Sequence, residues 1–389
     1  MIIQRDIYIK IKPYLSSPEA IVITGMRRTG KTTLLKFIYD KISSDNKLYI
    51  DLENPINQKY FEEEDYEKIK FNFEVKGLNF NRQAYLFLDE IQFVKNLPQI
   101  VKYFFDHYKI KFFLTGSSSF YIKNLFSESL AGRKYIFELF PLNFKEFLLL
   151  KEEKLIIPKI GQKISKTIFN TFNRFYEEYL KFGGFPGVVA KKDFQEKKMA
   201  LDDIFSSYFQ LEIVQLGDYK KTNVIRDLIL LLMQRVGSKL DVQKIAQELA
   251  VSRPTIYDYL AFLEGTYFIK LIKLYSKSKD VEIRGANKIY LCDSGLVNNS
   301  IQVSEGALFE NSIFQLLRPQ GEINYYQKKG GVEIDFIFNK NKAYEVKLKP
   351  SQQDLNKLDR ISKELKIKDF KLISKSYSNI ENVIYGFNI

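Results

Sequence analysis

The chain has very little of the two side chains on which much enzyme chemistry depends. Its 389 residues include one cysteine, Cys292, and one histidine, His107. A single cysteine excludes an intrachain disulfide and is typical of a reducing compartment, so we expect a cytoplasmic protein. A single histidine excludes sites that need two, among them most catalytic zinc centres.

Long apolar runs are also lacking. The longest, Leu228–Met233, is far shorter than the roughly 20 residues that a helix needs to cross a bilayer, so we expect no membrane-spanning segment. Apolar residues still make up 45% of the chain, which is ordinary for a globular protein. The length suggests about two to four domains, each able to bury a core.

Positive charge is in excess. Lysine and arginine number 60 against 47 aspartates and glutamates, which gives a formal net charge of +13 spread along the chain. Such an excess favours polyanionic partners, so we expect DNA as a partner. Lysine enrichment also accompanies the codon usage of an AT-rich genome, so the charge alone does not decide.

Residues 21–32 read Ile-Val-Ile-Thr-Gly-Met-Arg-Arg-Thr-Gly-Lys-Thr, and residues 25–32 fit G-x-x-x-x-G-K-[ST]. A β-branched strand precedes this pattern and a helix, Thr33–Lys41, follows it. In such a loop the backbone N–H groups point at phosphate oxygens, and the helix N-terminus adds partial positive charge. We expect Lys31 to bind the β- and γ-phosphates of ATP and Thr32 to coordinate Mg²⁺. The residues expected at the nucleotide are Gly25, Arg28, Thr29, Gly30, Lys31, Thr32, Thr33 and Asp89.

Two carboxylates follow a second apolar strand, in Tyr-Leu-Phe-Leu-Asp-Glu at residues 85–90. Ligands of open α/β sheets bind at the carboxyl ends of the strands. We therefore expect Asp89 to hold the magnesium ion and Glu90 to polarise the attacking water. A small-molecule kinase needs no water-activating glutamate, so the pair favours hydrolysis. After the next strand, Ser117 or Ser118 would sense the γ-phosphate, and the pattern does not choose between them.

An arginine follows in Leu-Ala-Gly-Arg at residues 130–133. The phosphate loop, Asp-Glu, Thr-Gly-Ser-Ser and Leu-Ala-Gly-Arg in this order resemble the prokaryotic AAA-family ATPases. The resemblance implies that Arg133 is an arginine finger that reaches the γ-phosphate of a neighbouring subunit, and therefore a homo-oligomer. The alternative is an arginine that only stabilises the fold. The family also carries a Gly-Gly-Phe-Pro turn, here residues 183–186, which we interpret as structural.

Residues 240–263 read as helix, short turn, helix, with Ser252 suited to cap the second helix. A hairpin at residues 267–275, surrounded by lysines, is expected to follow and to complete a winged helix. The motif would either read DNA, with Arg253 near the major groove and lysines on phosphates, or clamp two domains together. The sequence leaves both open.

The C-terminal segment is expected to form a helix, three strands, a helix and a strand, at residues 306–317, 323–327, 332–338, 343–349, 352–365 and 370–373. This order resembles the PD-(D/E)XK nuclease superfamily. The resemblance implies that Glu310, Asp335 and Glu345 hold Mg²⁺ and that Lys347 orients the attacking water. Alternating strand side chains put Glu345 and Lys347 on one face, and a hairpin would bring Asp335 beside Glu345. The alternative is a nuclease fold that binds DNA or protein without cutting.

These patterns predict an α/β protein with a P-loop AAA-type ATPase core, a helical lid, a winged helix-turn-helix and a restriction-endonuclease-like α/β domain. The expected bounds are 1–145, 146–220, 221–282 and 283–389, and the expected cofactors are ATP and Mg²⁺. The leading hypothesis is an ATP-binding and hydrolysing ATPase that acts on DNA, with a metal-dependent nuclease domain. The alternative is an ATP-controlled DNA- or protein-binding switch whose nuclease-like domain is inactive.

Overall fold

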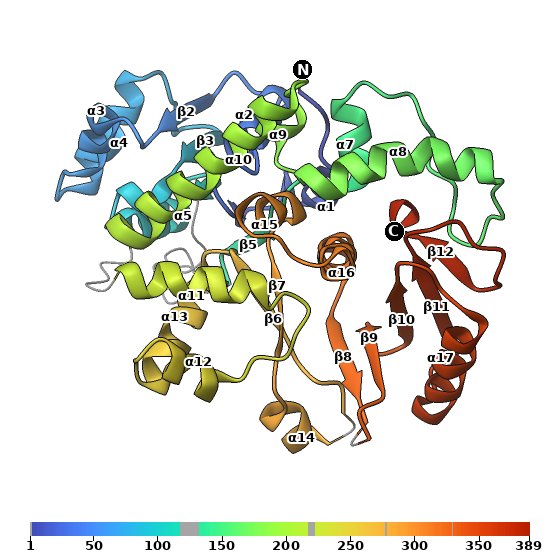
Figure 1. Cartoon of the computed structure of the whole chain (residues 1–389). Helices are drawn as coiled ribbons and strands as arrows, with labels where there is room; N and C mark the ends of the chain where they lie inside the picture. The colour runs from blue at the N-terminus through green and yellow to red at the C-terminus, as the bar shows by residue number, and fades with distance from the viewer. Residues whose placement is uncertain (1, 117–131, 217–221, 277, 329) are drawn as a thin grey trace. The chain divides into compact units, whose positions relative to one another are not determined.

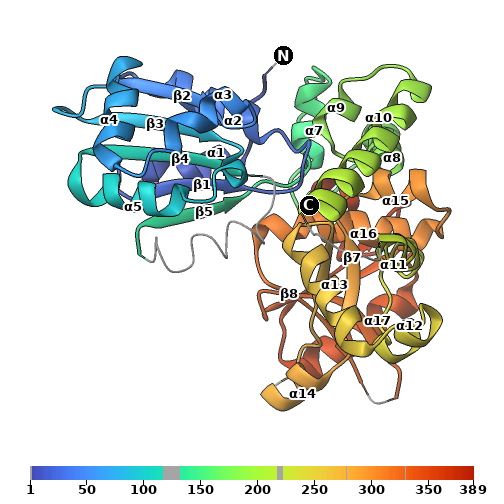
Figure 2. The same ribbon diagram turned by 90° about the vertical axis from the view of Figure 1, so that its left-hand side faces the viewer.

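The computed structural model describes residues 2–116, 132–216, 222–276, 278–328 and 330–389. The chain divides into two compact units, shown in two views in Figure 1 and Figure 2. The first comprises Met1–Phe140 with Gly265–Tyr267, and the second comprises Pro141–Glu264 with Phe268–Ile389. No helix among the described residues is long and apolar enough to cross a membrane.

The first unit is built on a parallel sheet. Its five strands are ordered β2-β3-β4-β1-β5, and every neighbouring pair is parallel. The strands are β1 (Ala20–Thr24), β2 (Lys47–Asp51), β3 (Ala84–Asp89), β4 (Ile110–Gly116) and β5 (Lys134–Glu138). The helices are α1 (Ile7–Ile11), α2 (Lys31–Lys41), α3 (Pro55–Gln58), α4 (Tyr66–Val75) and α5 (Leu97–His107).

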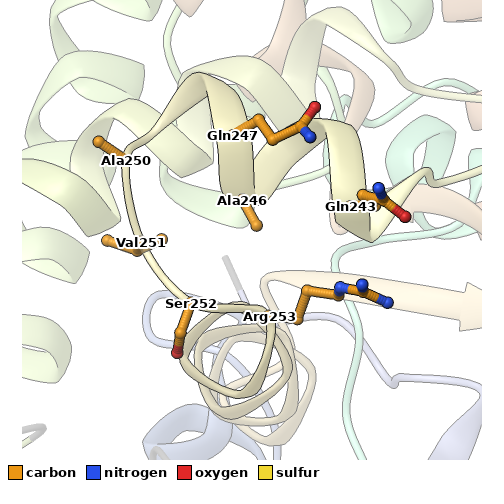
Figure 3. Close-up of a pocket in the computed structure, with 7 residues that line it drawn as sticks. All are labelled: Gln243, Ala246, Gln247, Ala250, Val251, Ser252 and Arg253. Atoms are coloured by element: carbon orange, nitrogen blue, oxygen red, sulfur yellow. The ribbon is translucent and has the colours of Figure 1, made fainter.

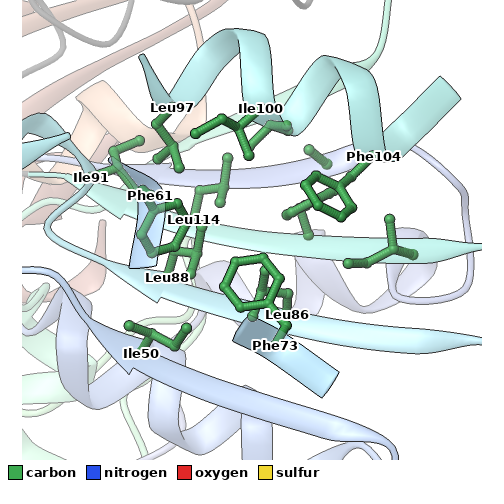
Figure 4. Close-up of a cluster of buried hydrophobic side chains, with 14 of the residues drawn as sticks. Ile50, Phe61, Phe73, Leu86, Leu88, Ile91, Leu97, Ile100, Phe104 and Leu114 are labelled. Carbon is green, nitrogen blue, oxygen red and sulfur yellow. The ribbon is translucent and has the colours of Figure 1, made fainter. Parts of the chain in front are cut away.

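Both faces of this sheet are buried, which explains the near-continuous apolar runs of its central strands. Leu86 and Leu88 of β3 pack in the layer that contains Phe104 of α5 (Figure 4). Phe87, between them, faces the other layer, where it stacks on Phe113 of β4 with ring centroids 4.4 Å apart. Each such buried side chain contributes about 1.5–3 kcal/mol, so the two layers fix the sheet on which the loops are mounted.

The second unit begins with helices and ends with a mixed sheet. Its helices are α7 (Phe144–Leu150), α8 (Lys166–Phe182), α9 (Pro186–Val189), α10 (Phe194–Tyr208), the π-helix η4 (Phe209–Leu216), α11 (Thr222–Gln234), α12 (Val242–Glu248), α13 (Arg253–Gly265), α14 (Lys279–Arg284), α15 (Ser294–Ser300), α16 (Glu305–Leu317) and α17 (Gln352–Leu365). Its strands are β6 (Ile269–Ile272), β7 (Lys288–Leu291), β8 (Ile323–Gln327), β9 (Glu333–Phe338), β10 (Lys342–Lys347), β11 (Asp369–Ser374) and β12 (Val383–Tyr385).

The C-terminal sheet has the order β12-β11-β10-β9-β8. Strands β8, β9 and β10 are antiparallel neighbours, whereas β10, β11 and β12 are parallel. Leu355, Leu358 and Ile361 recur at helical spacing along α17 and pack on Ile337 and Leu372 of the sheet. This buried stripe explains why the helix was predictable from its periodicity.

The expected hairpin at residues 267–275 is wrong. Strand β6 forms there, but its antiparallel partner is β7, which follows α14, with Ile269 opposite Leu291. The middle of the expected hairpin, Lys-Leu-Ile-Lys at residues 270–273, contains no glycine or asparagine for a tight turn. Leu274 instead forms a bridge with Tyr325 of β8, so the chain continues toward the C-terminal sheet.

The Gly-Gly-Phe-Pro turn lies at a close backbone approach. The Gly184 N–H donates to a carboxylate oxygen of Asp293 at 2.8 Å, and the Leu142 N–H donates to the Gly184 carbonyl at 2.7 Å. A Cβ on Gly184 would lie 2.2 Å from the Leu142 carbonyl oxygen. Asp293 also caps α15, because it accepts the Leu296 N–H at 3.0 Å. The turn is therefore a packing junction within the second unit.

Candidate nucleotide site and carboxylate cluster

The phosphate loop joins β1 to α2, and two glycines fix its shape. Gly25 has a φ of +151° and Gly30 a φ of +96°, which other residues rarely adopt. A Cβ on Gly25 would lie 2.2 Å from the Leu139 carbonyl oxygen. Because α2 begins at Lys31, directly after the loop, its N-terminal N–H groups and partial positive charge lie at the carboxyl end of β1.

The Lys31 ammonium is held inside this loop. The residue is 4% exposed, and its ammonium donates to the carbonyl oxygens of Gly25 and Met26, each at 3.0 Å. The Thr29 hydroxyl donates to the same Met26 carbonyl at 2.8 Å. The remaining loop and first-turn residues expected at the nucleotide are exposed or half-buried: Arg28, Thr32 and Thr33. The positive group is therefore fixed where phosphate would bind.

Arg5 supports the loop from the N-terminal segment. Its guanidinium donates to the Thr29 carbonyl at 2.9 Å and to the Phe140 carbonyl at 2.7 Å, and the residue is 7% exposed. The sequence analysis missed this residue because nothing near it in the chain marks it. Only folding brings it under the loop.

Asp89 lies at the end of β3 with both carboxylate oxygens hydrogen-bonded. It is 2% exposed, and it accepts the hydroxyls of Thr115 and Tyr49, the latter at 2.8 Å. Burial, and then the Asp89 carboxylate, raise the pKa of Tyr49 above its ordinary value, so its hydroxyl stays protonated and donates. Strand β4 lies between β1 and β3, so Thr115 stands between the loop and Asp89. A hydroxyl at the end of a strand was the sequence signal that could have identified Thr115. The prediction placed the hydroxyl on Ser117 or Ser118 instead.

Glu90 directly follows this aspartate in a left-handed conformation, with a φ of +54°. Its N–H donates to the Thr115 hydroxyl oxygen at 3.2 Å, and its carboxylate accepts the side-chain amide of Gln92. A positive φ is uncommon for a residue with a side chain. This turn ends β3 and places Glu90 directly after Asp89. Ser117 and Ser118 lie outside the described residues.

Arg133 lies at the amino-terminal ends of the strands, whereas Lys31 lies beyond the carboxyl end of β1. Arg133 precedes β5, and its carbonyl accepts the N–H of Ala20 at the start of β1. Its guanidinium donates to both carboxylate oxygens of Asp106 on α5, at 2.9 and 3.4 Å. Within one chain, the structure therefore does not bring Arg133 to the phosphate loop.

The two helices of the helix-turn-helix form as expected, with side-chain caps. Asp241 accepts the Lys244 N–H at 3.0 Å, and Ser252 accepts the Thr255 N–H at 3.3 Å. Between α12 and the start of α13 lies a cleft of about 490 Å³ (Figure 3). Its lining residues are Gln243, Ala246, Gln247, Ala250, Val251, Ser252 and Arg253. Tyr257, one turn further along α13, is 59% exposed.

The C-terminal hairpin brings two of the expected carboxylates together. Tyr344 pairs with Phe336, so the next residues, Asp335 and Glu345, lie side by side. Asp335 accepts the backbone N–H of Val346 at 2.8 Å. Burial raises the pKa of Asp335 well above its ordinary value, and the nearby carboxylates of Glu310 and Glu345 raise it further. The hairpin register and the Val346 N–H therefore place Asp335 next to the strand segment that carries Glu345.

Lys288, which the sequence analysis did not consider, lies among these acids. Its ammonium is 3.4 Å from a carboxylate oxygen of Glu310 and 3.8 Å from one of Asp335, and it contacts Glu333. Burial alone would lower the pKa of Lys288, but Glu310, Asp335 and Glu333 outweigh it and raise the pKa above its ordinary value. A single lysine in a lysine-rich chain gives no sequence signal for such a position.

Glu345 is held by two other lysines. Its Oε1 lies 2.9 Å from the Lys347 ammonium and 3.3 Å from that of Lys357, whereas its buried Oε2 has no hydrogen-bond partner among the described residues. Across those residues, no group of three or more His, Cys, Asp and Glu side chains is arranged to hold a metal ion. The acids expected to bind Mg²⁺ are therefore near one another but do not fit it as arranged.

Comparisons with known proteins agree with the fold of the first unit. Residues 17–148 match a family described as an AAA domain, and residues 173–306 match a domain of unknown function, DUF8612. The uncharacterized protein MJ1544 of Methanocaldococcus jannaschii is 31% identical over 97% of this chain and 86% of its own length. An uncharacterized protein of Haemophilus influenzae is 30% identical over 82% of this chain and 79% of its own length.

Solved structures are more distant. The ORC1 protein of Aeropyrum pernix in complex with DNA aligns over 80% of this chain and 94% of its own, with 12% identity and a TM-score of 0.35. A likeness at that TM-score supports no conclusion about function.

Proposed function

The chain belongs to the protein family of MJ1544 from Methanocaldococcus jannaschii and carries an AAA domain at residues 17–148, and on that premise we propose that it binds and hydrolyses ATP. One observation carries the proposal. The loop that holds Lys31 and the strand end that holds Asp89 lie at the same edge of one sheet, with Thr115 between them. That edge is where ligands bind in parallel α/β sheets.

The oxygen groups at this edge fit a magnesium nucleotide. The Thr32 hydroxyl and the buried Asp89 carboxylate are hard oxygen donors of the kind that Mg²⁺ prefers. When bound with ATP, Mg²⁺ supplies positive charge that offsets the developing charge on the phosphates. Lys31 binds the β- and γ-phosphates, the backbone of residues 25–30 surrounds them, and Glu90 accepts a proton from the attacking water.

Two substitutions separate binding from hydrolysis. Lys31→Ala should abolish ATP binding, because it removes the buried ammonium that is held inside the loop. Glu90→Gln should keep ATP bound but slow hydrolysis by about 10²-fold or more, because it removes the proton acceptor. Equilibrium binding of a fluorescent ATP analogue and phosphate release measure the two effects. A Glu90→Gln protein that hydrolyses ATP at the wild-type rate would end this assignment.

We also propose that the helix-turn-helix contacts DNA and that nucleotide turnover controls this contact. Arg253 and Tyr257 are exposed at the start of α13, next to the cleft against α12, and the chain carries a net charge of +13. Recognition helices contact base edges with the residues of their first turns. A clamp between domains would not need these two side chains exposed.

An arginine elsewhere in the second unit provides the control. Arg253→Ala should weaken binding to double-stranded DNA by about tenfold or more, as expected for one lost charged contact. Arg226→Ala, which removes the same charge from an exposed site on α11, should change it little. Fluorescence anisotropy over a range of salt concentrations measures both. Equal affinities of the two variants would favour the clamp.

For the C-terminal sheet, the observations favour the switch over the nuclease. The Lys288 ammonium among Glu310, Glu333 and Asp335 is the supporting feature, since a metal-dependent nuclease needs those oxygens for a cation. Supercoiled, linear, single-stranded and branched DNA should remain uncut with ATP and Mg²⁺ or Mn²⁺. Cleavage that chelator and Asp335→Asn both abolish would restore the nuclease.

A further inference from the structure

The carboxylate cluster of the second unit is built around an ammonium group. Lys288 is 3% exposed, and its side chain leaves β7 to meet acids from two other elements: Glu310 of α16, and Glu333 and Asp335 of β9. The three elements are labelled in Figure 1. An ammonium that contacts three carboxylates occupies the position in which the same oxygens would hold a divalent cation.

The charges in this region are nearly balanced without a metal. Four carboxylates face three ammonium groups, because Glu345 is paired with Lys347 and Lys357 while Lys288 serves the other three acids. A divalent cation would add two positive charges within contact distance of Lys288. Like charges that close repel strongly in a buried site. The ammonium and the metal would therefore compete for the same oxygens.

One buried oxygen indicates what the cluster would do without the lysine. Among the described residues, Glu345 Oε2 is buried without a hydrogen-bond partner, beside Asp335 across the hairpin. A buried carboxylate oxygen that lacks a partner costs free energy. It is a ready ligand for a small hard cation once the neighbouring position is vacated.

We propose that the Lys288 ammonium is the resident cation of this cluster, so that the wild-type chain binds no divalent metal ion there, and that removing it creates a site for Mn²⁺ or Mg²⁺. The proposal goes with the switch function proposed above, in which this sheet does not cleave DNA. It explains why these acids, which occur in the sequence order expected of a nuclease, are not arranged to hold a metal ion. It also gives Lys288 a structural task, since it ties β7, next to the helix-turn-helix, to β9 of the C-terminal sheet.

Binding of Mn²⁺ to the full chain without nucleotide tests the proposal, with free Mn²⁺ measured by electron paramagnetic resonance. Wild type and Lys239→Met should show the same weak background. Lys239 is the matched control, because it is an exposed lysine near β7 whose ammonium contacts Gln327 and not the acids. Lys288→Met should bind one more Mn²⁺ per chain, and Lys288→Met with Asp335→Asn should lose it again. A Lys288→Met protein that binds no more than Lys239→Met would overturn the proposal.

Stability provides a second readout. Removing one member of a buried ion cluster leaves uncompensated charge and destabilises the fold. Lys288→Met should therefore have a lower thermal midpoint than wild type in chelator, and Mn²⁺ should raise it by several degrees more than it raises that of wild type. Equal responses of the two proteins to Mn²⁺ would count against a site created by the substitution.

The wild-type chain decides the matter even if Lys288→Met does not fold. Mn²⁺ binding by wild type that Asp335→Asn removes would overturn the proposal, and identical titrations of these two proteins would support it. The outcome is distinct from that of the DNA assay. Mn²⁺ bound by wild type without DNA cleavage would contradict only this inference, whereas metal-dependent cleavage would contradict the switch function as well.

Discussion

Thr115 connects both acidic residues of the candidate nucleotide site through one hydroxyl. The hydroxyl donates to the buried Asp89 carboxylate and accepts the Glu90 N–H at 3.2 Å. The same atom therefore fixes the group expected at the magnesium ion and the turn that carries the expected base. This makes Thr115 a positioning residue, which acts through Asp89 and Glu90.

Thr115→Val keeps the shape of the side chain but removes the hydroxyl. It should leave a buried carboxylate oxygen and a backbone N–H unpaired, at a cost of about 1–3 kcal/mol. We expect kcat for ATP hydrolysis to fall by about tenfold or more, with a smaller change in KM. Steady-state kinetics measure both, and Thr115→Ser should restore most of the rate. Loss of folding in Thr115→Val with no rescue by serine would reduce the residue to a structural role.

Asp293 gives the stability of the second unit a dependence on pH. Burial raises the pKa of this carboxyl group from 3.8 to about 6, although the N–H groups of Gly184, Leu296 and Gly295 lower it in part. Because the folded-state pKa is above the unfolded one, the contribution of this group is fully present below pH 4 and is lost as the pH rises through 6.

Asp293→Asn cannot ionise, so it should lack this dependence. Between pH 4 and 7, wild type should lose up to about 3 kcal/mol of stability relative to the variant, since one pKa unit corresponds to about 1.4 kcal/mol. Urea denaturation followed by circular dichroism across this range measures the difference. Only the change with pH matters, because the substitution also alters hydrogen bonds at every pH. Parallel pH profiles would contradict the assignment.

At the scale of elements, the packing junction at the turn after α8 depends on glycine. A Cβ on Gly184 would lie 2.2 Å from a backbone oxygen of Leu142, which cannot move aside as a side chain would. Gly184→Ala should therefore destabilise the second unit by about 3 kcal/mol or more. Gly187, three residues on in α9, would meet nothing within 4 Å, so Gly187→Ala should be neutral or slightly stabilising. The thermal midpoints of the two variants measure the difference in stability. A similar effect of both substitutions would contradict the proposed role of Gly184 at this junction.

Elements with a strong local pattern were predictable. Strand β1 and helix α17 form over the expected residues, because a continuous apolar run and a 3.6-residue stripe specify them locally. Strand β8 also forms over the expected residues. Strand β5 was not foreseen, since it is half-buried and lies at the sheet edge. The predicted partner of β6 was wrong. The strand pairs with β7, which lies beyond α14, and such a pairing is decided by tertiary contacts and not by a turn.

The residues of the candidate sites also divide into those that a local motif marks and those that only tertiary contacts bring into place. Lys31, Asp89 and Glu90 lie in short contiguous motifs, so their neighbourhood at one sheet edge follows from parallel strand ends. Arg5 and Lys288 are lone basic residues without a motif, and each reaches its partners only after distant segments have folded together. Sequence patterns therefore gave the acids of the C-terminal cluster but not the cation among them.

At the scale of the whole molecule, the position of Arg133 bears on assembly. Arg133 precedes β5 at the amino-terminal edge of the sheet, and Lys31 follows the carboxyl end of the neighbouring strand, β1. The five residues of β1 separate the two edges by roughly 16 Å. Arg133 therefore has to act on the ATP of another subunit if it acts on ATP at all.

The Asp106 ion pair supplies the control for this last prediction. Arg133→Ala should still bind ATP but lose hydrolysis, and mixing it with Lys31→Ala protein should restore part of the activity, since each supplies what the other lacks. Asp106→Ala breaks the same partly exposed ion pair, which contributes about 0–1 kcal/mol, but keeps the guanidinium, so it should retain hydrolysis. If Arg133 only stabilised the fold, both substitutions would have the same effect and mixing would restore nothing. Phosphate release at a series of protein concentrations completes the test, because a rate per chain that stays constant down to the monomer would leave no role for a neighbouring subunit.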